Sequence, residues 1–502
     1  MIIDKIPNNR QRICLIGSGI AGGSLAVKLA EKGIGFTLVE AGGLNGSSDS
    51  VGYENVGRQF GLRSTTSIQL GGTSNLWHGV LSPLDEIDFQ EREWIPNSGW
   101  PVTLDDLRAY YAEAAEMLNV RDYAYFDTEG LSEDLKAKLD DMKFNRGVLK
   151  NKMFQQPLPE VNFKDKIIPL VEKSDKYHAI LNTTALKLNL DSNWKIISLT
   201  VGFADGSTGL IEADVFIVSA GALETPRLLL NSGIDNKNIG KYLMDHPMGN
   251  LCQVQFRHRQ KAHIYSAMRY ISDIAIKTGL ELTPEKQKEM GFPNHTFYMR
   301  PSFKKGVNNE TEKIKLSLLA FKDGGLTAAD VWRVMTNLNV IYQIVTYKLS
   351  LDTTYKYADL FFVTEQIPSE NSFVGLSDKK DKWGFPISRV NWQVSSHDIE
   401  VMEKWYTLLK EQALGEDDYI FTHEFKDINW NKFFTSAAHH VGTARMAHSA
   451  DKGVVDKYLK VFGTENLYVC DGSIFTTSGN VNNGFTISAF ACRLAEHIRR
   501  MQ

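Results

Sequence analysis

The N-terminal stretch RICLIGSGIAGGSLAVKLAEKGIGFTLVEAGG constrains the fold of this chain more than any other segment. An apolar run of strand length leads into Gly17, Gly19 and Gly22, which have G-x-G-x-x-G spacing. A helical pattern follows, and a second apolar run ends at Glu40, whose carboxylate suits a ribose hydroxyl. This order is typical of a βαβ unit that binds a pyrophosphate at its helix N-terminus. The stretch therefore predicts a dinucleotide site, for which FAD and NAD fit alike; a glycine-rich turn without a ligand is the alternative.

Two later stretches have the same order of strand, glycine turn and helix. In the first, an apolar run at 215–218 ends at a glycine turn, and a helix is predicted from 228–230 onward. In the second, a short strand at 467–470 precedes a glycine turn and a terminal helix that begins near Phe485. Since each piece supplies one strand and one helix, we expect a single sheet assembled from distant segments.

Composition narrows the class of protein. The 502 residues suffice for two to four domains. Lys and Arg total 56 against 60 Asp and Glu, with no basic tract, so nucleic acid is not an expected partner. No apolar run is long enough to span a membrane, which predicts a cytoplasmic protein for which a membrane partner is unlikely. The cysteines are scattered without a C-x-x-C pair, which argues against disulfides and a zinc site: Cys14, Cys252, Cys470 and Cys492.

Five further motifs follow the N-terminal unit along the chain. They are LGGTSNLW (70–77), VSAGALETPRLLLNSG (218–233), DHP (245–247), HHVGTARM (439–446) and LYVCDGSIFTTSGNVNNGFTI (467–487). In these motifs and their order the chain resembles the glucose–methanol–choline (GMC) oxidoreductases, a family of FAD-dependent alcohol oxidases and dehydrogenases. The stretch GWPVTLDDLRAYYAEAAEMLNV (99–120) is more similar to the sugar-acting side of the family, that of pyranose oxidase and fructose dehydrogenase.

The resemblance implies an α/β fold with two domains. One is a discontinuous Rossmann-like FAD-binding domain, and the other is a substrate domain with an antiparallel sheet flanked by helices. Alternating apolar residues at 252–256 and 373–376 suit such a half-buried sheet. The expected boundaries are 1–80, 165–250 and 432–502 for the FAD-binding domain, and 81–164 and 251–431 for the substrate-binding domain.

The histidine three residues before Gly-Thr in HHVGTARM is the predicted catalytic base. This residue is His439, and the resemblance pairs it with Asn482. The chemistry agrees, because alcohol oxidation needs a base near the hydroxyl and a neutral amide that orients the oxygen. A hydrogen-bonded core histidine is the alternative for His439. His440 points to the opposite face of an extended segment, so a structural role is expected for it.

The resemblance also implies which residues contact FAD. Asp471 is expected at the ribityl chain, or as a turn cap, and Asn75 at the ring edge, or as a turn cap. The full predicted set is Gly17, Gly19, Gly22, Glu40, Gly71, Gly72, Thr73, Asn75, Ala220, Asp471, Gly472, Asn483 and Thr486.

Four features depart from the family pattern or lie outside it. Leu76 stands where some members attach FAD through a histidine, so FAD is expected to be non-covalent. His78 is predicted to touch the flavin or the substrate, with a surface role as the alternative. Gln366 is predicted to bind a sugar hydroxyl, or else to face solvent. The apolar row at 331–349 has helical spacing and predicts a core or lid helix; a membrane-surface or partner-binding helix is the alternative.

These features together predict FAD-dependent oxidation of an alcohol group on a sugar, a polyol or a sugar-bearing natural product. His439 would remove the proton, and the hydride would go to flavin N5. The expected partners are the small-molecule alcohol and an electron acceptor, either oxygen or another, and no metal is expected. A lyase on the same fold, which would use the histidine without net redox change, is the alternative function. A nucleotide-binding module without catalysis is a third class, whereas the single G-x-G-x-x-G disfavours an NAD-dependent dehydrogenase.

Overall fold

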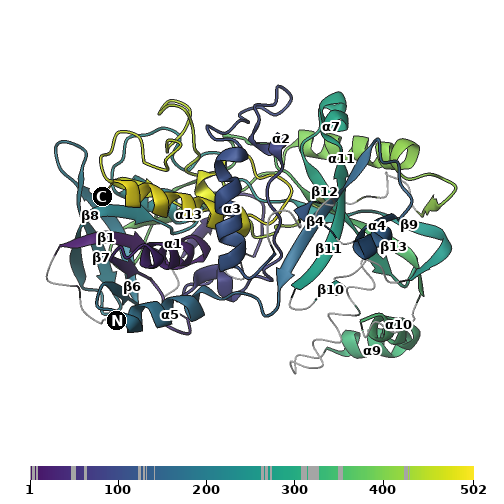
Figure 1. Cartoon of the computed structure of the whole chain (residues 1–502), viewed down its shortest axis with the longest axis horizontal. Coiled ribbons are helices and arrows are strands. Elements are labelled where there is room, and N and C mark those ends of the chain that lie inside the picture. The colour runs from purple at the N-terminus through teal and green to yellow at the C-terminus, as the bar shows by residue number, and fades with distance from the viewer. Residues whose placement is uncertain are drawn as a thin grey trace.

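The computed structural model arranges the chain around two large sheets that lie side by side along its long axis (Figure 1). Both termini lie at the end that holds the first sheet. The structure describes residues 2, 6, 10–46, 52–61, 65–121, 126, 127, 131, 133–140, 142–261, 265, 269–271, 274–306, 314, 327–348, 354–422, 428 and 430–501.

The first sheet joins the three separated βα pieces, as the sequence predicts. Its strand order is β5-β2-β1-β8-β7-β6, and β17 also pairs with β8. Strands β5, β2, β1, β8 and β17 are parallel, so their carboxyl ends lie at one edge, where dinucleotides bind in open α/β sheets. The strands are β1 (Gln11–Ile16), β2 (Phe36–Val39), β5 (Tyr177–Ile180), β6 (Thr183–Leu190), β7 (Ile196–Phe203), β8 (Thr208–Val218) and β17 (Leu467–Val469).

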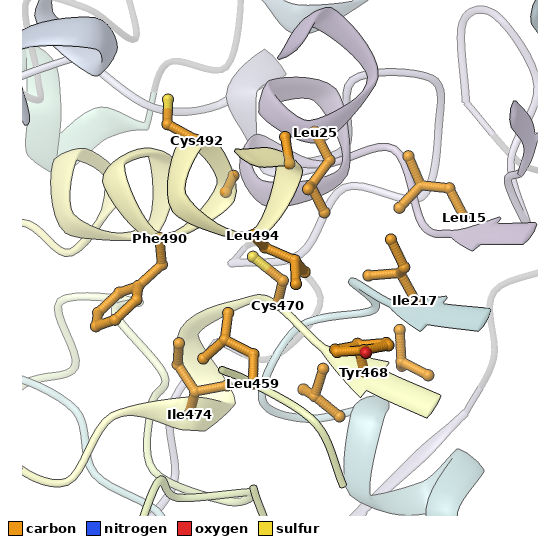
Figure 2. Packing of buried hydrophobic residues seen from close by; sticks show 14 of the residues in the cluster. Leu15, Leu25, Ile217, Leu459, Tyr468, Cys470, Ile474, Phe490, Cys492 and Leu494 are labelled. Carbon is orange, nitrogen blue, oxygen red and sulfur yellow. The ribbon is translucent and has the colours of Figure 1, made fainter. Parts of the chain in front are cut away.

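Helices α1 (Ile20–Glu31) and α13 (Gly484–Arg500) pack against each other over this sheet. Strands β1 and β8 are apolar toward their C-terminal ends because both faces of a parallel sheet are covered there. Figure 2 shows this core as one layer of side chains drawn from α1, β1, β8, β17 and α13. The four cysteines are all buried and unpaired. The labelled members from these five elements are Leu15, Leu25, Ile217, Tyr468, Phe490, Cys492 and Leu494.

The second large sheet is antiparallel, as predicted, with the order β10-β11-β12-β13-β9-β16 and with β4 paired to β11. It has its own apolar core, which Trp405 of helix α11 (Ser396–Leu408) completes on one face. A capping box of Ser395 and Asp398 begins that helix. The strands are β4 (Leu149–Pro157), β9 (Met248–Lys261), β10 (Arg269–Ile271), β11 (Ile274–Leu282), β12 (His295–Ser302), β13 (Thr354–Thr364) and β16 (Tyr419–Phe421).

A small third sheet pairs β14 (Phe373–Lys380) with β15 (Pro386–Asn391) and β15 with β3 (Tyr53–Asn55). Other helices connect or cover these sheets: α2 (Glu86–Phe89), α3 (Asp105–Met117), α4 (Glu133–Asp140), α5 (Phe163–Lys173), α6 (Thr225–Asn231), α7 (Pro284–Met290), α9 (Ala328–Thr336), α10 (Leu338–Lys348) and α12 (Trp430–Phe433).

Helix α3 differs from its predicted place. The expected boundaries assign 81–164 to the substrate domain, but α3 packs against α13. Its residues Leu107 and Tyr111 are fully buried in the same cluster as Leu15 of the first sheet. An amphipathic helix shows that it covers an apolar surface, but its sequence does not show which of two sheets supplies that surface.

The described members of the apolar row at 331–349 are mostly exposed, although Val340 of the same stretch packs with Ile314 in a small buried cluster. Met335 and Leu338 are 67% and 63% exposed, and no residue of α9 is buried. The prediction of a core helix is therefore wrong, because helical spacing of apolar residues does not guarantee a partner surface. Leu349 lies outside the described residues, and the lid, partner and membrane-surface alternatives stay predictions. Among the helices that the structure describes, none has the length and apolar character to cross a membrane.

Candidate active site

The turn after β1 requires glycine at two positions. Gly17 has a φ of 96°, and a Cβ atom there would lie 2.4 Å from the carbonyl oxygen of Ser219. A Cβ atom on Gly22 would lie 1.9 Å from the carbonyl oxygen of Gly17. Both distances are far inside van der Waals contact, so the first turn of α1 can approach the strand ends only without these side chains. The result is an open helix N-terminus at Gly19, which is suited to a phosphate.

Glu40 ends β2 and organises the same turn. Its Oε2 accepts hydrogen bonds from the backbone N–H of Ser18 at 3.1 Å and from the Ser18 hydroxyl at 2.5 Å, and its Oε1 accepts from the N–H of Gly42 at 2.9 Å. Burial raises the pKa of Glu40, and these hydrogen bonds oppose the increase. The sequence prediction that Glu40 accepts from a ribose hydroxyl stays a prediction.

A cavity of about 580 Å³ opens along this edge of the first sheet. Its volume lies within the range of roughly 300–1,000 Å³ that is usual for ligand and cofactor sites. Three buried polar atoms in its wall have no hydrogen-bond partner: Ser219 Oγ, Asn483 Oδ1 and His440 Nε2. Such atoms fit a polar ligand that satisfies them, because buried polar groups are normally paired. The predicted residues that line the cavity are Gly17, Gly19, Glu40, Gly72, Thr73, His78, Ala220, His439, Asp471, Gly472, Asn482 and Asn483.

Asp471 caps the turn, as one of its two predicted roles requires, and contact with the ribityl chain stays a prediction. Its Oδ2 accepts from the Gly221 N–H at 2.9 Å and from the Thr225 hydroxyl at 2.6 Å, and its Oδ1 accepts from the Ser473 N–H at 2.8 Å. It therefore ties the turn after β17 to the start of α6 while its side chain borders the cavity. Burial raises the pKa of Asp471, and the hydrogen bonds oppose that change.

Four predicted cofactor residues lie behind the cavity wall. Gly22 and Gly71 belong to the two turns, and Gly71 donates its N–H to Ser18 Oγ at 3.0 Å. Asn75 donates to the carbonyl of Gly72 at 2.8 Å, so it braces the turn, as its alternative interpretation stated. The hydroxyl of Thr486 lies 2.7 Å from the Tyr111 hydroxyl, within the core. These residues shape the wall from behind instead of facing the cavity.

Gln366 does not line the cavity either. The residue is 2% exposed. Its Oε1 accepts from the Asp245 N–H and from Trp392 Nε1, both at 2.9 Å, and its amide group donates to the carbonyl of Gln393. Because these hydrogen bonds occupy its side chain, Gln366 has neither of the roles expected from the sequence. It does not face solvent, and it does not border the cavity in which a sugar hydroxyl would bind.

His439 is held by its backbone at both ends. Its N–H donates to Asp245 Oδ1 at 2.9 Å, and its carbonyl accepts from Asn483 Nδ2 at 3.1 Å. The preceding Ala438 has a φ of 63°, in the left-handed region, which turns the chain sharply before the imidazole. Burial lowers the pKa of His439 to about 3, with His246 adding to the decrease and Asp245 opposing it. The ring is therefore neutral at ordinary pH, the form that accepts a proton.

Asn482, His78 and Leu76 border the same cavity as His439. Asn482 Nδ2 donates to the carbonyl of Val80 at 2.9 Å, which fixes the amide. The backbone carbonyl of His78 accepts from Gln156 Nε2 at 2.7 Å, and its side chain is exposed. Leu76, at the position where the resemblance implies a flavin-linked histidine in some members of the family, is 50% exposed. The described part of the chain contains no group of three or more His, Cys, Asp or Glu side chains that could hold a metal.

The sequence interpretation missed Asp245 and His246. The Asp-His-Pro motif served only as a mark of the family, although it places a carboxylate and an imidazole beside the predicted base. Asp245 Oδ1 accepts from the N–H groups of His246 and His439, at 2.7 and 2.9 Å. His246 Nδ1 lies 2.9 Å from His439 Nδ1. The Asp-His-Pro motif at 245–247 was the sequence signal from which both residues could have been predicted.

A dinucleotide-binding edge, a buried acidic residue that ends the second strand and an imidazole in the same cavity suit an enzyme that uses a dinucleotide cofactor. Two family models agree: residues 170–248 match the N-terminal part and residues 368–491 the C-terminal part of the GMC oxidoreductase family. The chain is therefore similar to this family in both of these parts. It is accordingly an FAD-dependent alcohol oxidoreductase.

Relatives of known activity are distant in sequence. A 2-methyl-1,2-propanediol dehydrogenase from Mycolicibacterium austroafricanum is 24% identical over 97% of this chain and 95% of its own length. The large subunit of fructose dehydrogenase from Gluconobacter japonicus is 23% identical over 65% of this chain and 55% of its own. The solved structure of pyridoxine 4-oxidase from Mesorbium loti shares the fold, with a TM-score of 0.59 and 17% identity over 98% of this chain and 99% of that one.

Proposed function

We propose that this protein oxidises an alcohol group on a sugar, a polyol or a sugar-bearing natural product. The observation that carries the proposal is that His439 and Asn482 border one cavity with the glycine turn and Glu40. A base and an amide thus face the space that the dinucleotide-binding edge provides. The cofactor, when bound, supplies the acceptor for a hydride.

The two polar side chains have separate tasks. His439, neutral because it is buried, accepts the proton of the substrate hydroxyl. Asn482 has a second N–H that the bond to Val80 leaves unused, and this N–H orients the substrate oxygen and stabilises the negative charge that develops on it. His78 lies in the same wall and provides a polar contact for further hydroxyls.

The names of several relatives support a hydroxyl-rich substrate. They act on 2-methyl-1,2-propanediol, on fructose and, for an oxidase from Streptomyces lividus that is 23% identical over 97% of this chain, on 6'''-hydroxyparomomycin C. Dehydrogenases and oxidases both occur among these relatives, so the electron acceptor needs a direct test. Because Leu76 offers no nucleophile at the attachment position, FAD is proposed to be held without a covalent bond.

The decisive experiment mixes the holoenzyme anaerobically with a panel of polyols, sugars and glycosides and follows the flavin absorbance. We expect bleaching with at least one substrate, and loss of bleaching in His439→Ala while FAD stays bound. His448→Ala, which changes an exposed histidine, is the matched control. Turnover without flavin reduction would favour a lyase, and bleaching that survives His439→Ala would refute the base. Admission of air then tests oxygen as acceptor, and acid precipitation that leaves the flavin in solution supports non-covalent FAD.

A further inference from the structure

His246 is a fully buried imidazole in direct contact with the base of the proposed reaction. Its ring meets that of His439 edge-on, with centroids 5.1 Å apart and an interplanar angle of 82°. It is 0% exposed and does not line the cavity. Its two ring nitrogens have different neighbours: Nδ1 lies 2.9 Å from His439 Nδ1, and Nε2 lies 3.0 Å from the carbonyl oxygen of Ser478.

These two contacts decide where the protons are. A carbonyl oxygen only accepts hydrogen bonds, so His246 Nε2 must carry a proton. A neutral imidazole carries one proton, so His246 Nδ1 has a lone pair and accepts. The 2.9 Å contact is then satisfied only if His439 Nδ1 donates. His439 consequently has its own lone pair on Nε2.

The surroundings keep His246 neutral. The charged and titratable groups that face it are Asp245, Glu365, His439 and, across the strand ends, His295. The Asp245 carboxylate accepts backbone N–H groups, and Glu365 is paired with a buried arginine, so neither bonds to the His246 ring. Burial lowers the pKa of His246, which disfavours a second proton on this ring.

We propose that His246 is a positioning residue that holds His439 in the tautomer whose Nε2 can accept the substrate proton. This inference rests on the proposed function, since it assigns the state of its base. Asp245 supports the arrangement because one carboxylate oxygen receives the backbone N–H of both histidines. The rings therefore keep their contact without relying on side-chain packing alone.

The proton and the electrons balance in the resulting step. The O–H bond of the alcohol breaks and its proton goes to His439 Nε2. FAD, when bound, would supply the acceptor for the hydride that the carbon loses as the carbonyl forms. His439 is then a cation whose Nδ1–H still donates to the neutral His246. A hydrogen bond from a charged donor is about twice as strong as a neutral one, so the contact strengthens as the proton arrives. The opposite tautomer would present an N–H to the substrate and could not act as a base.

A set of variants tests this role by flavin reduction in a single turnover. His246→Asn places an amide oxygen near the position of Nδ1 and keeps an acceptor, so we expect a rate constant within a few-fold of wild type. His246→Leu removes the acceptor, and we expect at least about tenfold slower reduction, with the roughly 10²–10⁴ that a general base contributes as the upper limit. FAD binding and substrate affinity should be unchanged in both variants. His448→Leu, which makes the same substitution at an exposed histidine, is the matched control.

A double variant separates positioning from a structural effect. If His246 acts through His439, then His246→Leu combined with His439→Ala should be no slower than His439→Ala alone. A further slowing in the double variant, wild-type reduction in His246→Leu, or equal losses for His246→Leu and His246→Asn would each overturn the proposal. If His439→Ala itself reduces flavin normally, the proposed function fails; if only the His246 variants behave like wild type, this inference alone fails.

A measurement on the unmodified holoenzyme keeps the proposal testable should the leucine variant not fold. With ¹⁵N-labelled histidine, the His439 resonances are assigned by their loss in His439→Ala. We expect a protonated Nδ1 and an unprotonated Nε2 for His439, and the reverse for His246. A protonated Nε2 on His439 in the resting enzyme would overturn the assignment, and this readout does not depend on turnover.

Discussion

Replacing Arg92 by methionine leaves a buried carboxylate without its counter-ion. Arg92 follows α2, Glu365 follows β13, and their side chains are 1% and 0% exposed. The pair is bidentate, with Nη1–Oε2 at 2.8 Å and Nη2–Oε1 at 2.5 Å. Glu365 also accepts the backbone N–H of Asn294 at 2.7 Å, so its carboxylate stays fixed when Arg92 is removed.

The expected cost follows from that burial. Removing one partner of a buried ion pair typically costs about 3–5 kcal/mol, because the remaining charge keeps its desolvation penalty. A second buried carboxyl group, that of Asp88, increases this penalty. Burial and the nearby Glu365 raise the pKa of Asp88 to about 7, and Arg92 opposes that increase. With a urea m value of about 3 kcal/mol/M, a loss of about 4 kcal/mol lowers the unfolding midpoint by more than 1 M.

The assay is urea unfolding of the FAD-saturated protein, followed by tryptophan fluorescence. Arg108→Met is the matched control because Arg108 and its partner Asp105 are exposed, and such pairs contribute about 0–1 kcal/mol. The double variant Arg92→Met/Glu365→Gln removes both charges and keeps an acceptor for Asn294, so it should recover most of the loss. A midpoint for Arg92→Met no lower than for Arg108→Met, or a double variant as unstable as the single one, would refute the reasoning.

Three further predictions test the glycine turn, the exposed helix α9 and the buried His295. Gly22→Ala forces a Cβ atom to 1.9 Å from a carbonyl oxygen, so the purified protein should have a low flavin-to-protein absorbance ratio. Gly415→Ala is the control, because nothing lies within 4 Å of its Cβ position, and this variant should keep its FAD. Met335→Lys changes a 67% exposed side chain and should alter the free energy of unfolding by less than about 0.5 kcal/mol; a loss near 2 kcal/mol would mean that α9 is covered. Burial lowers the pKa of His295 to about 4, below its ordinary value of 6.5, so this group contributes stability above pH 6.5 that is lost as pH falls toward 4. His295→Gln should therefore lose less stability than wild type over that interval in urea titrations, and equal losses would contradict the shift.

Local chemistry explains what the sequence could predict. The G-x-G-x-x-G turn is determined by contacts between residues that are close in sequence, such as Gly22 and the carbonyl of Gly17. The strands that flank it were predicted within a few residues, because a covered parallel strand is a short apolar run whatever its neighbours are. The same holds for the turns before α6 and α13, where a glycine and a helix start lie close together in sequence.

Contacts between distant segments explain what could not be predicted. Gln366 is turned away from the cavity by Asp245 and Trp392, partners that no local pattern reveals. Met335 belongs to a helical apolar row, but whether such a row is covered depends on a surface elsewhere in the chain. His246 lies 193 positions from His439, so their contact has no sequence spacing by which to recognise it.

The positions of these residues separate the chemistry from the choice of substrate. Asp245, His246 and Gln366 form a buried support that touches the base from behind, and none of them borders the cavity. His78 and Leu76 border the cavity and make no contact with that support among the described hydrogen bonds. A substitution at His78 can therefore change which alcohol is accepted without disturbing the tautomer of the base. A substitution at Asp245 should slow every substrate alike, because Asp245 holds the backbone of His439, the proposed base.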